Sequence, residues 1–201
     1  AALLIGSNLR KDQPIINHRL RKAALNGASV MVLNPIDYEF NFPLDCKIIS
    51  PPNKITSELS AILKAVIKLS GEKADTAITK LLKDATVNET HQTIADTLFN
   101  NDDAIVLLGN FTTAHPQLAL LRTLSGEIAK LTHSKLGYLS ESVNSSGAWL
   151  SGAVPHRLTG GSKNSNIGLS SHEMLTQKLK AYLLLGVEPE LDCWDTRLAQ
   201  Q

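Results

Sequence analysis

A short phrase that occurs three times constrains the fold of this chain more than any other feature. Residues 3–8 are LLIGSN, residues 106–110 are VLLGN, and residues 183–189 are LLLGVEP. Continuous apolar runs of this length are typical of strands in a parallel sheet, because such strands are covered on both faces. The phrase therefore predicts an α/β fold. It also directs attention to the glycines, since ligands of open α/β sheets bind beyond the carboxyl ends of the strands.

Two stretches repeat the order strand, glycine, asparagine, loop, proline, helix, strand. Gly6 is followed by Pro14, and Gly109 is followed by Pro116 at nearly the same distance. Apolar residues at helical spacing predict helices after both prolines, and Pro suits the first turn of a helix. The predicted fold class is a Rossmann-like α/β domain, with a mostly parallel sheet of about six strands flanked by helices on both faces.

This pattern also predicts how the chain divides into parts. A main α/β domain is expected over residues 1–180, followed by a last strand and tail over 181–201 that could begin a neighbouring domain. Within the main domain the predicted parts are two βαβ units, a helical insertion and a long Ser/Asn/Gly-rich loop. Their boundaries are 1–50 and 103–140 for the units, 55–100 for the insertion and 140–170 for the loop.

The composition excludes several classes of protein. The formal net charge is +1, which gives no indication of nucleic acid or an anionic membrane as a general partner. No apolar run approaches the roughly 20 residues that span a bilayer. Cys46 and Cys193 are isolated, so no zinc or iron–sulfur motif is present, while a disulfide between them stays an alternative to two thiols. The chain starts without Met and inside a predicted strand, which suggests a piece of a longer polypeptide.

The familiar catalytic motifs are missing from the sequence. It contains no GxGxxG, GxxxxGK[ST], GxSxG or HExxH, and its six histidines are scattered. His18 lies within a predicted helix and His115 precedes a predicted helix start, and structural roles are expected for both. We therefore predict no catalytic residue and no metal ligand.

Ligand chemistry is most plausible in the loops that follow the strands. Gly6, Ser7 and Asn8 lead towards a predicted helix, as do Gly109 and Asn110, and helix N-termini attract anions. The alternative is that Gly-Asn simply makes a tight corner between strand and helix, and the sequence favours it. Residues 159–166 could likewise form a backbone nest for an anion or be a solvated loop.

The first of these stretches resembles a known family. LLIGSNLRKDQPIINHRLRKAALNGASVMVLNP is similar to the segment of molybdopterin oxidoreductases that runs strand, G-x-N-P, His-Pro, helix, N-G-A-K, strand, D-P-R. A later stretch, KLGYLSESVNSSGAWLSGAVPHR, is followed by KAYLLLGVEPELD. These two segments more specifically resemble the large iron–sulfur subunit of bacterial NADH–quinone oxidoreductase. That subunit belongs to the peripheral arm of respiratory complex I.

This resemblance implies an activity, partners and a location. The complex transfers electrons from NADH to quinone, and its large iron–sulfur subunit carries the clusters on Cys-rich N-terminal modules that are not in this chain. The region that remains is implied to hold no cofactor. Its implied partners are the cluster-bearing modules of the same polypeptide and the other subunits of the peripheral arm. The implied location is the cytoplasmic side of the bacterial inner membrane, without membrane insertion and without nucleic acid.

The chain departs from the cofactor-binding pattern of the family. Asn34-Pro35-Ile36 stands where Asp-Pro-Arg is common, so the acid that would bind guanine or ribose and the Arg that would pair with phosphate are both missing. We interpret the domain as a structural scaffold that has lost molybdopterin. The alternative is a working cofactor-binding domain, whose site would be lined by six residues: Gly6, Ser7, Asn8, Asn34, Gly109 and Asn144.

Overall fold

The computed structural model describes residues 1–72, 75–140, 142–193 and 195–200. The chain forms two compact units, Ala1–Glu141 and Ser142–Gln201, which we describe separately. The predicted division into domains after residue 180 stays a prediction.

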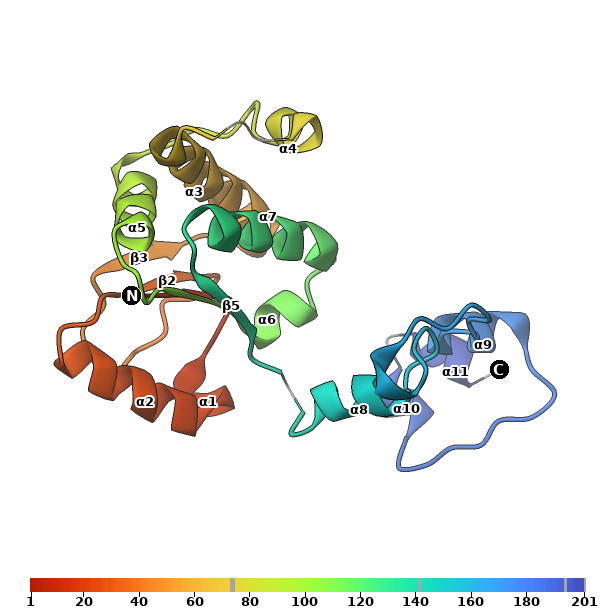
Figure 1. Cartoon of the computed structure of the whole chain (residues 1–201). Helices are drawn as coiled ribbons and strands as arrows, with labels where there is room; N and C mark the ends of the chain where they lie inside the picture. Colours follow the sequence, from red (N-terminus) through yellow and green to blue (C-terminus); the bar gives the residue numbers. More distant parts are fainter. Residues whose placement is uncertain (73–74, 141, 194, 201) are drawn as a thin grey trace. The chain divides into compact units, whose positions relative to one another are not determined.

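The first unit is built on a parallel five-stranded sheet, and the predicted α/β fold class is confirmed (Figure 1). Its order is β3-β2-β1-β4-β5. The strands are β1 (Ala2–Ile5), β2 (Val30–Asn34), β3 (Cys46–Ile49), β4 (Ile105–Leu108) and β5 (Lys135–Tyr138). Every residue of β1 and β2 is buried, as the uninterrupted apolar runs predict, whereas the edge strands β3 and β5 are partly exposed.

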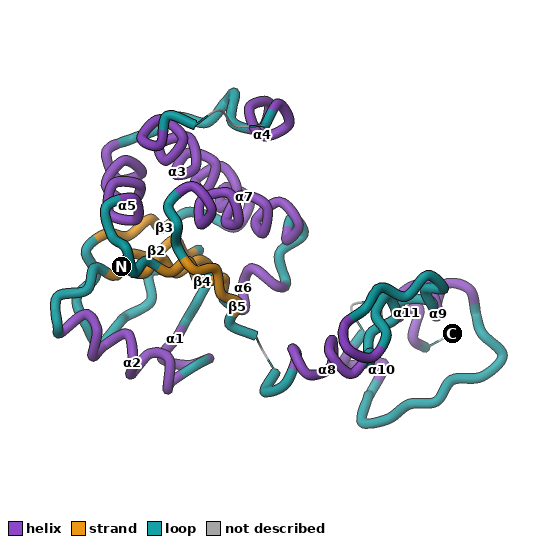
Figure 2. The backbone as a smooth tube through the Cα atoms, viewed as in Figure 1, coloured by secondary structure: helices purple, strands orange, loops and turns teal. Residues whose placement is uncertain are grey.

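Helices cover both faces of this sheet (Figures 1 and 2). One face carries α3 (Ile55–Ser70), α5 (Glu89–Phe99) and α7 (Leu118–Leu131). The other carries α1 (Leu9–Asp12) and α2 (Pro14–Leu25).

Alternate residues of each strand contribute to different cores, because successive side chains of a strand point to opposite faces. Leu3 and Ile5 of β1 belong to the larger core under α3, α5 and α7. Ala2 and Leu4 belong to a smaller core that includes Ala24 of α2. The central strand is thus buried on both sides by aliphatic residues.

Helices occupy the chain between β3 and β4. This segment opens with the 3-10 turn η1 (Pro52–Lys54), which leads directly into α3. One side of α3 is apolar and buried, and the helix is capped by Gly71 in the left-handed conformation, a common way to end a helix. A short helix, α4 (Thr76–Leu81), separates α3 from α5. A second short helix, α6 (Asn110–Thr113), follows β4.

The second unit contains short helices. They are α8 (Ser145–Ser151), α9 (Ser171–Gln177), α10 (Pro189–Asp192) and α11 (Thr196–Ala199), together with the 3-10 turn η2 (Thr159–Gly161). The prediction of a long loop over residues 140–170 was wrong in part, because α8 and η2 lie within it. Ser and Gly are poor helix formers, and their abundance concealed the helix.

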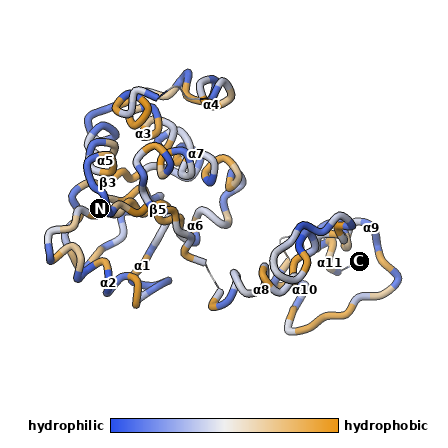
Figure 3. The backbone as a smooth tube through the Cα atoms, in the orientation of Figure 1, coloured by the Kyte–Doolittle hydropathy of each residue, from blue (hydrophilic) through white to orange (hydrophobic). Residues whose placement is uncertain are grey.

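The last strand predicted within residues 181–201 is not among the described elements, and the sheet has five described strands instead of about six. Leu183 is 97% exposed and Leu185 is 91% exposed. The segment between α9 and α10 is apolar along much of its length (Figure 3). A buried strand needs neighbouring strands and covered faces, and no described residue of the second unit is buried. None of the helices in the described part of the chain has the length and apolar character needed to cross a bilayer.

Candidate functional site

The carboxyl ends of β1, β2 and β4 meet where the predicted ligand site would lie. The sheet order changes direction at this edge, since β1 connects to β2 on one side and pairs with β4 on the other. Gly6 donates its backbone N–H to the carbonyl of Leu33 at 2.9 Å, and Gly109 donates to Ile5 at 2.8 Å. The first residues of both loops therefore continue the hydrogen bonding of the sheet.

The two glycines of the repeated phrase touch each other at this edge. Gly6 has φ +61°, a conformation that favours glycine, and a Cβ there would lie 2.9 Å from Cγ2 of Thr112. A Cβ on Gly109 would lie 2.5 Å from the carbonyl oxygen of Gly6 and 2.5 Å from Cβ of Ser7. The glycines are required because the turns after β1 and β4 pack directly against each other.

Asn34 joins the ends of β1 and β2. Its Oδ1 accepts a hydrogen bond from the Ser7 N–H at 2.8 Å, and its Nδ2 donates to the Ser7 carbonyl at 3.1 Å. Asn34 is 0% exposed, so both bonds are shielded from water. An ionised Asp could accept the first bond but could not donate the second. The neutral amide of Asn34 can therefore close this corner with one donated and one accepted bond.

The outer rim of the edge is formed by half-buried amides. Asn8 precedes α1 and makes no capping bond with its side chain. Gln13 donates from Nε2 to Oδ1 of Asn110 at 3.4 Å and to the carbonyl of Ser140 at 3.3 Å, which links the ends of β1, β4 and β5. Gln13 was missed by the sequence analysis, and no motif marks it. Its partners lie 97 and 127 residues away in the chain.

His115 fastens the loop after β4 to the loop after β3. Its Nδ1 accepts a hydrogen bond from the Gln117 N–H at 3.0 Å, so the proton lies on Nε2, which donates to the Pro52 carbonyl at 3.0 Å. Thr56 then donates from its hydroxyl to the side chain of Gln117 at 3.0 Å. With both ring nitrogens occupied, His115 has the structural role that the sequence analysis expected. His18 is exposed on α2.

A second buried histidine also has a structural arrangement. His91 donates from Nε2 to Oε2 of Glu58 at 2.7 Å, and its Nδ1 accepts from the Asn88 N–H at 3.1 Å, completing a capping box at the start of α5. Ser50 donates to the other oxygen of Glu58 at 3.1 Å. The three side chains connect β3, α3 and α5. His91 has no nitrogen left to act as a base.

Asn144, the sixth predicted site residue, belongs to the second unit. It precedes α8, and a Cβ at Gly147 would overlap its side-chain amide. In the motif NSSG, the glycine three residues after Asn144 leaves room for the Asn144 side chain at the first turn of α8. In the same unit Trp149 packs edge-on against His156 at 4.6 Å between ring centroids. The predicted anion nest at 159–166 stays a prediction.

The described residues form no metal-binding cluster and no disulfide bond. No group of three His, Cys, Asp or Glu side chains in the described part of the chain could hold a metal ion. Cys46 and Cys193 are free, so the alternative of a disulfide is not realised. Burial, and then the negative charge of Asp45, raise the pKa of the Cys46 thiol.

A comparison with protein families identifies the family of this chain. The family model described as molybdopterin oxidoreductase matches residues 1–200. The chain belongs to the molybdopterin oxidoreductase family. The expected resemblance to this oxidoreductase family is thereby confirmed. No curated protein matches the chain.

Membership of the molybdopterin oxidoreductase family raises the question of whether the strand ends fit that cofactor. The atoms with which a protein contacts a cofactor are expected to line an open cleft. Ser7 is 1% exposed and Asn34 is 0% exposed, and Gly109 is buried as well. The Asn34 amide is engaged by the Ser7 backbone, and protein atoms cover the Ser7 hydroxyl, which has no hydrogen-bond partner. In this conformation these residues do not fit molybdopterin.

Proposed function

We propose that this domain is a structural scaffold that has lost molybdopterin binding. It would form part of the large iron–sulfur subunit of bacterial NADH–quinone oxidoreductase. This proposal rests mainly on one observation: residues at the carboxyl ends of β1, β2 and β4 fill the edge of the sheet where the cofactor would bind. The turns at Gly6 and Gly109 are in contact, and Asn34 uses both amide groups to hold Ser7. Its role would be to support the cluster-bearing modules of the same polypeptide and the neighbouring subunits of the peripheral arm.

The charges at this edge support the same proposal. A dinucleotide cofactor carries phosphates, which proteins commonly bind with Arg or with free backbone N–H groups. Ile36 occupies the position of the family's common Arg. Arg10, which follows β1, is paired with Glu39 at 3.3 Å. The scaffold would act in electron transfer from NADH to quinone only through the complex, on the cytoplasmic face of the inner membrane.

The test is cofactor analysis of the full-length polypeptide purified from its natural source. We expect molybdenum and tungsten well below one atom per polypeptide, and no pterin fluorescence after acid release and oxidation. The same preparation should contain iron and should fractionate with NADH-dependent quinone reduction. Stoichiometric pterin with molybdenum or tungsten would overturn the scaffold proposal. Iron without NADH-dependent quinone reduction in the same fractions would overturn the assignment to this complex.

One observation favours the alternative of a working cofactor-binding domain. The Ser7 hydroxyl and the Oε1 of Gln13 are buried at the strand ends without a hydrogen-bond partner, and such groups are uncommon in native proteins. In this alternative the loops separate on binding and offer these two groups to the cofactor. It predicts stoichiometric pterin, and it predicts that Ser7→Ala lowers the pterin content of the purified protein.

A further inference from the structure

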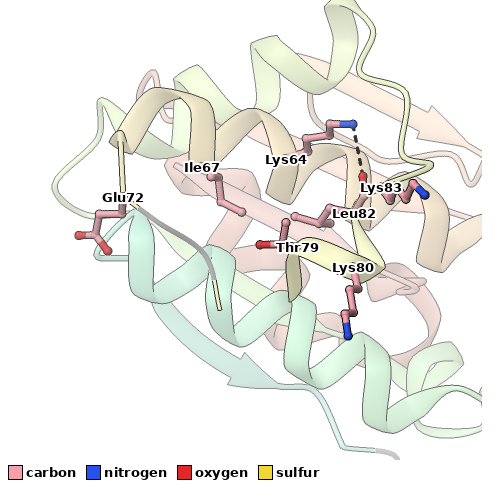
Figure 4. Close-up of a pocket in the computed structure, with 7 residues that line it drawn as sticks. All are labelled: Lys64, Ile67, Glu72, Thr79, Lys80, Leu82 and Lys83. Atoms are coloured by element: carbon pink, nitrogen blue, oxygen red, sulfur yellow. Dashed lines mark hydrogen bonds between the residues drawn. The ribbon is translucent and has the colours of Figure 1, made fainter. Parts of the chain in front are cut away.

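The first unit has a cavity far from the strand ends, between α3 and the segment that carries α4. Its volume is about 700 Å³, within the range of about 300–1,000 Å³ common for small-molecule sites. Figure 4 shows Ile67 of α3 and Leu82, which follows α4, extending into this space. The cavity therefore has an apolar floor that could receive a hydrocarbon chain.

Lysine side chains also line this cavity. Lys64 on α3, Lys80 on α4 and Lys83 just after α4 all line the cavity, against one carboxylate, Glu72 (Figure 4). Among the described residues, none of these three lysines has an ion-pair partner. The lining therefore combines an apolar surface with a net positive charge.

Lys64 holds one wall of the cavity in place. Its Nζ donates to the carbonyl of Ala85 at 2.7 Å and to that of Leu82 at 3.3 Å, which fixes the chain as it leaves α4. The third N–H of the ammonium group remains for a ligand. Ile78 is the buried residue of α4, and it anchors this short helix in the larger core of the first unit.

We propose that this cavity binds a free single-chain carboxylate amphiphile, that is, a medium- or long-chain fatty acid anion. The alkyl chain would lie on Ile67 and Leu82, and the carboxylate would be held by Lys80 and Lys83. The charge of the lining complements an anionic head, and the volume suits a small molecule. This site does not depend on the proposed scaffold function.

The test uses dodecanoate below its micellar concentration, titrated into the full-length protein by calorimetry. We expect one saturable site, and at least tenfold weaker affinity in the double variant Lys80→Glu, Lys83→Glu. The matched control is Arg19→Glu with Lys22→Glu, which makes the same charge change on α2, on the opposite face of the sheet. The control should bind as the unmodified protein does. Thermal melts establish that both variants are folded.

A second probe separates charge recognition from general hydrophobic adsorption. Dodecyltrimethylammonium has the same chain with a cationic head, and we expect it to bind at least tenfold more weakly than dodecanoate. Equal binding of the two amphiphiles, equal weakening by both double variants, or no saturable site would overturn the proposal. Sedimentation with anionic phospholipid vesicles that needs Lys80 and Lys83, without binding of free dodecanoate, would overturn it in favour of a membrane surface.

Discussion

The repeated sequence phrase forms different structures in the two units of this protein. In the first unit, LLIGSN and VLLGN become buried parallel strands, and their glycines Gly6 and Gly109 are in contact. In the second unit, residues 183–188 of LLLGVEP are exposed. A Cβ on Gly186 would meet nothing within 4 Å, although its φ of +62° resembles that of Gly6. The difference shows that this sequence can form a strand, but does so only where neighbouring strands and covering helices are available.

The two units also differ in how they bury apolar side chains. The first has a core on each face of its sheet, whereas the second has no buried residue in its described part. Its helices have seven residues or fewer, and isolated helices of that length are not stable in water. The second unit therefore depends on local contacts such as the packing of Trp149 against His156.

The largest expected contrast between the units is in hydrogen exchange. Backbone amides of β1 should exchange only through global unfolding, because the strand is central and buried. Amides of Tyr182–Leu185 should exchange at least a thousandfold faster. Exchange followed by mass spectrometry of peptides from the intact chain measures both. Equal protection of the two segments in a monomer would show that the third phrase is a strand after all.

The next largest effect is expected for an added methyl group at a contacting glycine. Gly109→Ala places a Cβ against the Gly6 carbonyl and Ser7, and should lower the free energy of unfolding of the first unit by about 3 kcal/mol. Urea denaturation measures the loss. The control, Gly186→Ala, has left-handed strain without overlap and lies in the second unit, so it should leave the free energy of unfolding of the first unit unchanged. If both variants lose the same stability, contact between the two turns is not the reason for the glycine.

Substitution of Asn34 should have a somewhat smaller effect. Asn34→Ala leaves the Ser7 N–H and carbonyl without partners and should cost about 2 kcal/mol. Asn34→Asp should cost at least as much near neutral pH, since it buries a charge beside a carbonyl oxygen.

The Asp variant has a distinctive pH dependence. Burial raises the pKa of such a carboxyl, so its penalty should be full above that folded pKa and should shrink as the pH falls and the acid becomes a donor. Urea titrations at several pH values test this. An Asp variant as stable as the original protein at neutral pH would contradict the role assigned to Asn34, and pterin in that variant would favour the alternative function.

The smallest expected effect concerns the Cys46 thiol at the edge of the sheet. Its raised pKa lowers the thiolate fraction at pH 8, so alkylation by iodoacetamide should be several-fold slower in the folded than in the urea-unfolded protein. Asp45→Asn removes the second cause of the shift and should speed alkylation slightly. A folded-state rate equal to the unfolded rate would show that the first unit does not shield this edge.

Local patterns were sufficient for much of the first unit. The first helix predicted at a proline begins at Pro14 and ends at Leu25, because its proline, its apolar spacing and Asn26-Gly27 all act within a few residues. The helix at Glu89–Phe99 lies within residues 55–100, where the sequence predicts a helical insertion. The site was less accessible to prediction, since Asn34 meets Ser7 across 27 residues and Gln13 meets Asn110 across 97.

The sequence by itself determined the α/β class, the buried character of the central strands and the positions of most helices in the first unit. Those features follow from apolar periodicity and turn residues, which act over short distances. The tertiary structure alone decided which apolar runs became strands, and that the glycine corners close on each other where a ligand was expected. Both outcomes depend on contacts between residues far apart in the chain. An apolar run does not itself determine whether other elements will cover both of its faces.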